Sequence, residues 1–365
     1  TPAAAGVGRE QDFPGWGMDG QRLHSREEGV PPECWCITKE DLLFLRMEIE
    51  TAVKTGTIRP TDLDPFDPAD NEVGPCMHTV VASYVKPLTA EAGNMSWALM
   101  RHPEGIKCDM FVTHCWAEGA YEFIDKVLAS WPRRTEGAWC CIFANPQNLD
   151  ISDMIKEPKE SPFARALQQA PRMMVVPTVK ASIYSRIWCI YEAFLAVELR
   201  KTVFTATTPI QRKLPYSLLA GATLSVTSLL IGYLTAGSIF GHLCKADLSK
   251  YTTGFPLLLA CLSFVVARRP LLSAGVNIAG TATVMVMAGM FIRKAQLCHD
   301  GDFRFAWMPI SCAYFFANEI DRLRANDARS QARSLSKGYA GVQGASASVE
   351  ADRVRILGEI GDRSG

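Results

Sequence analysis

Two long stretches of the sequence contain no charged residue. They run from Leu214 to Gly241 and from Pro270 to Ile292. A helix needs about 20 mainly apolar residues to cross the hydrocarbon core of a bilayer, and both stretches reach that length. We therefore expect a helical transmembrane region, with membrane lipid as a partner. Any catalytic or binding domain must then be formed by the rest of the chain.

The number of spans depends on two weaker segments. Residues 251–267 form a shorter uncharged run, and residues 305–318 form another that is rich in aromatic side chains. With four spans in 214–318, both flanking regions face the cytosol, which agrees with the preference of Arg-rich segments for that side. With three spans, the tail at 319–365 lies across the membrane. Both arrangements predict an integral, multi-pass membrane protein.

The uncharged stretches carry little that would support transport. Asn277 is the only amide side chain well inside them, and no acidic or basic side chain lies within them. Ion and proton pathways usually need ionisable groups inside the membrane. We expect the helices to anchor or assemble the protein, with Gly221 and Ser225 spaced for close helix contact. A transporter or channel with a regulatory domain is the less favoured alternative.

The composition also argues against several classes of ligand and partner. The chain has 38 basic and 38 acidic residues and a formal net charge of zero, so no bulk field indicates a nucleic-acid partner. The 12 cysteines lack the spacing of disulfide or zinc frameworks. An acidic loop at 62–70 lacks the central Gly and final Glu of a calcium loop. We expect reduced cysteines, a domain facing the cytosol, no metal site and no bound cofactor.

Two regions precede the main domain. Residues 1–37 are rich in Gly, Pro and charged residues, and we expect them to be disordered. Residues 38–104 are expected to form a helical and loop extension. Its first helix begins at Thr38, with Asp41 completing a loose capping box.

Residues 105–208 alternate short apolar runs with amphipathic stretches. The apolar runs, each of strand length, begin at Asp109, Ala138, Met173 and Thr202, and the second is expected to form a strand from Ala138 to Ala144. Helices are expected between them, at about 118–131, at 162–170 and in the segment after residue 185. Strands that alternate with helices at this spacing predict an α/β domain with a parallel sheet and right-handed crossovers.

The most informative pattern lies in residues 172–200. The apolar run Met173–Val176 is followed by a polar loop and then by an amphipathic helix. Trp188 and Glu192 lie four residues apart on one face of that helix. Open parallel sheets bind ligands beyond the carboxyl ends of their strands. An acidic side chain in the first two turns of this helix is therefore a candidate site residue.

This segment resembles the TIR (Toll/interleukin-1 receptor) domain family. Residues Ser185–Glu192, SRIWCIYE, are similar to the family's Ser-then-W-C-x-x-E motif, and Asp109–His114, DMFVTH, is similar to its first-strand box. The resemblance covers 105–208 and implies a TIR-like, flavodoxin-like parallel sheet. The chain departs from the family at Arg186, where many relatives have Ser, and its last strand and helix are missing before the membrane region.

The resemblance also implies roles for individual side chains. In the enzymatic members the Glu of the motif supports cleavage of NAD, so Glu192 is the candidate catalytic carboxylate. A carboxylate near the ribose suits the oxocarbenium-like transition state of that reaction. The candidate substrate-binding residues follow the first two predicted strands or belong to the motif; they are Thr113, His114, Trp116, Asn145 and Trp188. NAD is then a substrate and not a cofactor.

Two functions follow from this interpretation. One is a membrane-anchored signalling enzyme that hydrolyses NAD to nicotinamide and ADP-ribose and is activated by self-association. The other is a non-enzymatic TIR-like scaffold that binds other TIR-like domains. Three of the candidate residues also have a structural alternative: Glu192 as a solvent-facing helix residue, Trp188 as core, and His114 as a hydrogen-bonded structural group.

Overall fold

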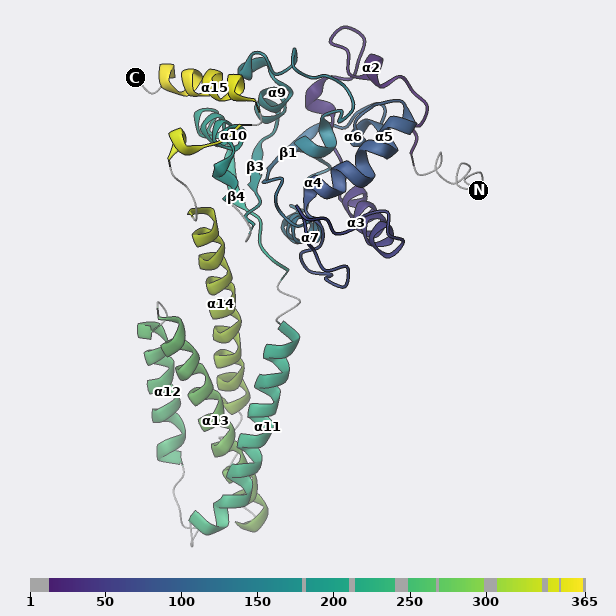
Figure 1. The fold of residues 1–365 in the computed structure, drawn as a ribbon. Coiled ribbons are helices and arrows are strands. Elements are labelled where there is room, and N and C mark those ends of the chain that lie inside the picture. The colour runs from purple at the N-terminus through teal and green to yellow at the C-terminus, as the bar shows by residue number, and fades with distance from the viewer. Residues whose placement is uncertain are drawn as a thin grey trace. The chain divides into compact units, whose positions relative to one another are not determined.

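A computed structural model of the chain describes residues 13–178, 182–209, 214–239, 249–266, 269–298, 307–336, 341–347 and 349–363. The chain divides into two compact units. The first comprises Thr1–Thr208 with Gln331–Gly365, and the second comprises Pro209–Ser330. The first contains the sheet, and the described part of the second contains helices and no strand (Figure 1).

Four parallel strands form the centre of the first unit, in the order β2-β1-β3-β4. Their bounds are Cys108–Thr113 for β1, Gly137–Cys140 for β2, Arg172–Val175 for β3 and Thr202–Thr205 for β4. The first three are almost wholly buried, as expected for parallel strands covered on both faces. The predicted α/β domain with a parallel sheet is confirmed. The strand order is also that of the first four strands of flavodoxin-like sheets.

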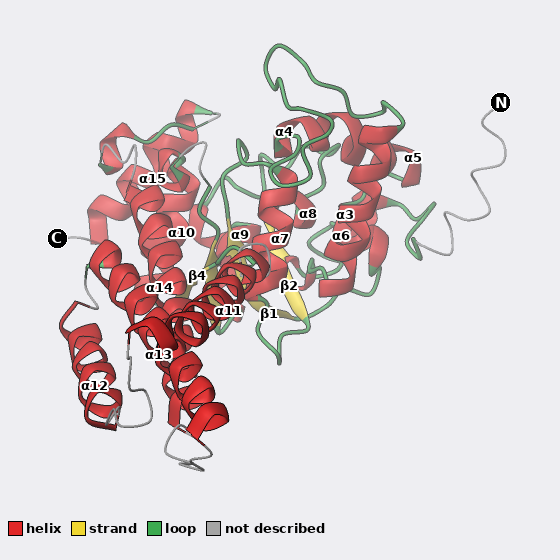
Figure 2. Cartoon of the chain, turned by 90° about the horizontal axis from the view of Figure 1, so that it is seen from below, coloured by secondary structure: helices red, strands yellow, loops and turns green. Residues whose placement is uncertain are grey.

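Helices connect the consecutive strands and surround the sheet (Figure 2). They are α7 (Ala120–Ser130), α8 (Cys141–Ala144), α9 (Pro162–Gln169) and α10 (Ile187–Glu198). Aromatic packing joins the layers: Phe111 of β1 stacks on Trp139 of β2, with ring centroids 5.1 Å apart, and Trp139 meets Phe163 of α9 edge-on at 5.3 Å. Short 3-10 turns lie at Pro32–Cys34, Pro158–Glu160, Ile183–Ser185 and Val342–Gly344.

The N-terminal region belongs to the same core. Its helices are α2 (Gly20–Leu23), α3 (Lys39–Lys54), α4 (Met77–Val80), α5 (Lys86–Ala92) and α6 (Trp97–Arg101), with a π-helical turn at Val81–Val85. The expected disorder of residues 1–37 is corrected for 13–37, because Phe13 and Trp35 are buried; residues 1–12 lie outside the described part. The capping box of Thr38 and Asp41 is confirmed.

The second unit consists of helices with unusual exposure of apolar side chains. They are α11 (Leu214–Ile239), α12 (Ser249–Val266), α13 (Pro270–Cys298) and α14 (Trp307–Ser336), which continues past the unit boundary. Two of them, α11 and α13, are long and apolar enough to cross a membrane. Only 17% of the apolar segment Leu219–Ala236 in α11 is buried, and only 33% of Leu271–Leu297 in α13. Leu234 is 73% exposed and Leu271 is 87% exposed. Helices in the core of a soluble protein would be mostly covered.

Glycines let α11 and α13 touch backbone to backbone. A Cβ added at Gly232 would lie 1.9 Å from the carbonyl oxygen of Val286, and one at Gly289 would lie 2.1 Å from that of Leu229. Small residues serve this purpose in membrane helix pairs. Gly221, which the sequence marked for helix contact, packs against the ring of Phe316 on α14.

The C-terminal residues pack on the first unit rather than forming a separate tail. Helix α15 (Glu350–Arg363) contacts α10. Just before α15, the backbone N–H of Ser346 donates to Ser185 O at 2.8 Å, and Ser346 O accepts from the N–H of Ile187 at 2.9 Å. This pairing adds a short extended segment beside the start of α10.

Candidate functional site

A cavity of about 560 Å³ lies at the carboxyl ends of the strands. The loop after β1 contributes Trp116, the segment after β2 contributes Asn145, and the start of α10 contributes Arg186 and Trp188. The C-terminal segment closes another side with Ser346. The position is the one at which open α/β sheets bind ligands, beside the point where the strand order reverses between β1 and β3.

The predicted site residues fall into two groups. Trp116, Asn145 and Trp188 line the cavity. Thr113, His114 and Glu192 are buried and are not part of its lining. Three of the six candidates thus line a cavity at the carboxyl edge of the sheet, and the other three lie buried outside its lining.

Two indole rings form aromatic walls. Trp188 stacks on Phe163, with centroids 4.8 Å apart and an interplanar angle of 17°, so it belongs to the core and to the cavity at once. Trp116 packs against the imidazole of His78 at 5.2 Å. The guanidinium of Arg186 lies 5.8 Å from the centre of the Trp116 ring. An aromatic ligand could stack beside a cation here.

Arg186 and Asp352 are the charged groups of the cavity wall, and Asp352 forms an ion pair with Arg355 at 3.7 Å. In the described part of the chain, no carboxylate lies within the 4.0 Å of the Arg186 guanidinium that would make an ion pair. Its position follows from the local fold: Arg186 is the N-cap residue of α10, and its backbone is bridged to Ser346. A guanidinium without a carboxylate partner is suited to bind a phosphate or carboxylate through paired hydrogen bonds.

Asn145 supplies an unused acceptor. Its side chain is only 5% exposed, and no donor among the described residues reaches its Oδ1. Leaving a buried polar atom unsatisfied costs about 1–3 kcal/mol. A ligand that donates a hydrogen bond would recover that cost.

Glu192 neither faces solvent nor lines the cavity. Its side chain is 5% exposed, and its Oε2 has no hydrogen-bond partner in the part of the chain that the structure describes. Burial raises the pKa of this carboxyl to about 7, although the Thr113 hydroxyl and the charge of Arg186 oppose the shift. The charge of Glu192 acts on the pKa of Arg186 and of Cys141, which both line the cavity.

His114 joins two residues that the sequence analysis did not single out. Its Nδ1 lies 2.6 Å from Glu118 Oε1, and its Nε2 lies 3.3 Å from the sulfur of Cys141. An acid, an imidazole and a thiol in this order resemble a nucleophilic triad. Burial, however, lowers the pKa of His114 to about 3 and raises that of Cys141 to about 11. The thiol therefore stays protonated near neutral pH, which does not favour a nucleophilic role for Cys141.

No group of three or more His, Cys, Asp or Glu side chains among the described residues is arranged to hold a metal ion. Arg186 could have been recognised from the sequence as a candidate site residue, since it is the departure from the motif that the chain otherwise resembles.

Comparisons with protein-family models, with curated proteins and with solved structures found no match.

Proposed function

We propose that the chain is a membrane-anchored, TIR-like signalling protein whose α/β unit binds NAD in the cavity beyond β1 and β3. One observation carries the proposal: the guanidinium of Arg186, which forms no ion pair with a described carboxylate, lies 5.8 Å from the Trp116 ring in a cavity that Trp188 also lines. NAD combines an anionic diphosphate with two aromatic bases. The diphosphate fits Arg186, and the bases fit the indole rings.

The proposed reaction is hydrolysis of the bond between nicotinamide and ribose. The bond from the ribose C1′ to the ring nitrogen breaks, nicotinamide leaves, and water adds its hydroxyl to C1′ and releases a proton. Glu192 would stabilise the positive charge that develops on the ribose. Only the ionised carboxylate can do so. Because its pKa is about 7, turnover would rise with pH through neutrality.

One observation favours the alternative of a non-enzymatic TIR-like scaffold. The carboxyl of Glu192 is 5% exposed and is not part of the cavity lining. In that case the cavity would bind NAD as a signal, and self-association or association with other TIR-like domains would follow without cleavage.

Binding and turnover of NAD by the full chain, in lipid nanodiscs, separate these functions. We expect the wild type to bind NAD and release nicotinamide. Glu192→Gln should keep the affinity and lose the release, whereas Glu198→Gln, at an exposed position of the same helix, should change neither. Arg186→Gln should weaken binding by roughly ten-fold or more, since hydrogen bonds to charged groups contribute about 1.5–3 kcal/mol; exposed Arg200→Gln is its control. Absence of NAD binding would refute the proposal, and binding without release in clustered protein would favour the scaffold.

We also propose that the helical unit crosses the membrane four times, with the α/β unit in the cytosol. Residues 341–347 and 349–363 pack on the unit that precedes the helices, which requires an even number of crossings. Arg322 and Arg329 follow the last apolar segment and favour the cytosolic side. In sealed vesicles, tags at the two ends of the chain should be digested or protected together. Protection of only one tag would contradict this topology.

A further inference from the structure

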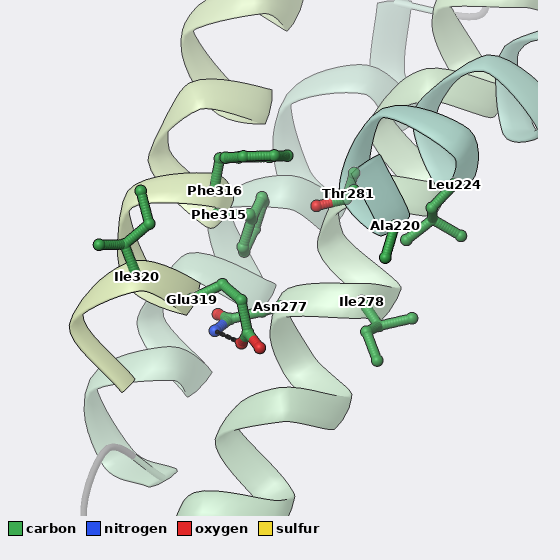
Figure 3. A pocket seen from close by; sticks show the side chains of 10 residues that line it. Ala220, Leu224, Asn277, Ile278, Thr281, Phe315, Phe316, Glu319 and Ile320 are labelled. Carbon is green, nitrogen blue, oxygen red and sulfur yellow. Dashed lines mark hydrogen bonds between the residues drawn. The ribbon is translucent and has the colours of Figure 1, made fainter. Parts of the chain in front are cut away.

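The helical unit contains a cavity of its own, of about 350 Å³, between α11, α13 and α14 (Figure 3). Its volume lies in the range of roughly 300–1,000 Å³ that is typical of small-molecule sites. Most of its wall is apolar, with Leu224 from α11, Ile278 from α13 and Phe315 from α14. Its lining has three polar side chains, Thr281, Asn277 and Glu319, and the last two lie together.

Two phenyl rings fix the position of α14 against its neighbours. Phe315 packs on Gly280 of α13, where an added Cβ would lie 2.5 Å from the ring. Phe316 packs on Gly221 of α11, where the corresponding distance is 2.3 Å. These contacts place the next turn of α14 so that Glu319 reaches Asn277.

The polar groups of this cavity leave one acceptor unused. Asn277 Nδ2 donates to Glu319 Oε2 at 3.1 Å, and Arg322 Nε donates to the same oxygen at 2.8 Å. Arg322 also forms an ion pair with Glu319, so the charge of that carboxylate is already balanced. Asn277 is 3% exposed, and nothing in the described helices donates to its Oδ1. An unsatisfied acceptor in apolar surroundings is costly, and a ligand that donates to it gains affinity.

We propose that this cavity binds a neutral membrane lipid whose hydroxyl group donates a hydrogen bond to Asn277 Oδ1. The missing partner is a donor, and the balanced charge of Glu319 and Arg322 gives no preference for a cationic ligand. The apolar wall accommodates the hydrocarbon part of such a molecule. Lipid is the available solvent, because α11 and α13 are long and apolar enough to cross a membrane and expose large apolar side chains. Sterols and diacylglycerols share this chemistry.

The test compares each alcohol with its methyl ether, which keeps the shape and removes the donor. Full-length protein in detergent is titrated with cholesterol, with dioleoylglycerol and with the two ethers, and affinity is measured from the shift in melting temperature. One of the alcohols should bind roughly ten-fold more tightly than its ether, as expected for one hydrogen bond to a buried acceptor. The alcohol that shows this difference identifies the lipid class.

Substitutions in the cavity test whether the preference for the alcohol over its ether arises there. Asn277→Leu should remove the preference for the alcohol, whereas Ser273→Ala, one turn away on α13 and outside the lining, should retain it. Leu224→Trp fills the cavity and should abolish binding of alcohol and ether alike. Equal affinity of the wild type for alcohol and ether, absence of binding, or binding that survives Leu224→Trp would each overturn the proposal. If Asn277→Leu does not fold, the comparison of alcohol with ether and the Leu224→Trp variant still test whether a lipid hydroxyl binds in this cavity.

Discussion

Replacing Glu192 with glutamine should stabilise the α/β unit at pH values above 7. Burial raises the pKa of this carboxyl from its ordinary 4.5 to about 7. Between these values the unfolded chain has lost the proton while the folded chain keeps it, so the free energy of unfolding falls as pH rises. The penalty is absent below pH 4.5 and complete above pH 7. Glutamine has nearly the same shape and cannot ionise, so the variant escapes the penalty.

The size of the effect follows from the shift. A difference of about 2.5 pKa units corresponds to about 3 kcal/mol, at 1.36 kcal/mol per unit. The Glu192→Gln variant should therefore equal the wild type near pH 4.5 and exceed its stability by about 3 kcal/mol above pH 7. This is a large fraction of the 5–15 kcal/mol that stabilises a typical domain.

Urea unfolding of the full chain in mild detergent, followed by tryptophan fluorescence, measures the difference across this pH range. All eight tryptophans except Trp307 lie in the first unit, so the signal reports mainly on it. The exposed Glu198→Gln variant controls for the loss of a carboxylate from α10. A variant less stable than the wild type at neutral pH would refute the reasoning, because it would mean that Glu192 is ionised and stabilised by Arg186. A difference that does not change with pH would refute it as well.

Three further outcomes follow from the geometry. Cys141 should be alkylated more slowly than half-buried Cys76 at pH 8, by mass spectrometry, because a pKa of about 11 leaves about one thiol in a thousand ionised; faster reaction would indicate an activated nucleophile. Gly232→Val should lower the melting temperature, since its Cβ would lie 1.9 Å from a backbone oxygen of α13, whereas Gly254→Val has space around it; equal effects would contradict the contact. Deleting residues 341–365 should remove one cavity wall and speed NAD association in stopped-flow measurements, and an unchanged rate would show that this wall does not limit entry.

The strands of the sheet could be predicted from the sequence because buried parallel strands are continuous apolar runs between polar segments. Runs beginning at Asp109, Ala138, Met173 and Thr202 each contain or overlap an observed strand. The length of the second was wrong: β2 ends at Cys140, and the apolar residues that follow form the turn of helix α8. Burial of both segments makes them equally apolar, so composition cannot separate the strand from the helix.

The folded state of residues 13–37 could not be predicted from their composition. This segment is rich in Gly, Pro and charge, and its order comes from contacts with distant parts of the chain. Trp139 Nε1 donates to Pro32 O at 3.0 Å, and the ring of Phe13 meets that of Trp97 edge-on at 5.5 Å. Such contacts leave no local signal, because the anchoring side chains are few and their partners lie far along the sequence.

Some features of the cavity depend on residues near one another in the sequence and could be predicted, whereas others depend on residues far apart and could not. The motif predicted a site at the carboxyl edge of the sheet, and Trp188 lines the cavity found there, since strand ends and helix faces follow from nearby residues. The burial of Glu192 could not be predicted from the sequence, because it depends on how segments that follow different strands pack together. The wall at Ser346 lies beyond the whole membrane region, and its backbone pairs on both sides of Arg186. A fragment limited to 105–208 would therefore contain the recognisable motif and lack part of the site. The residues that line the cavity run from His78 to Asp352, so activity or inactivity of the isolated segment would not decide what the protein does.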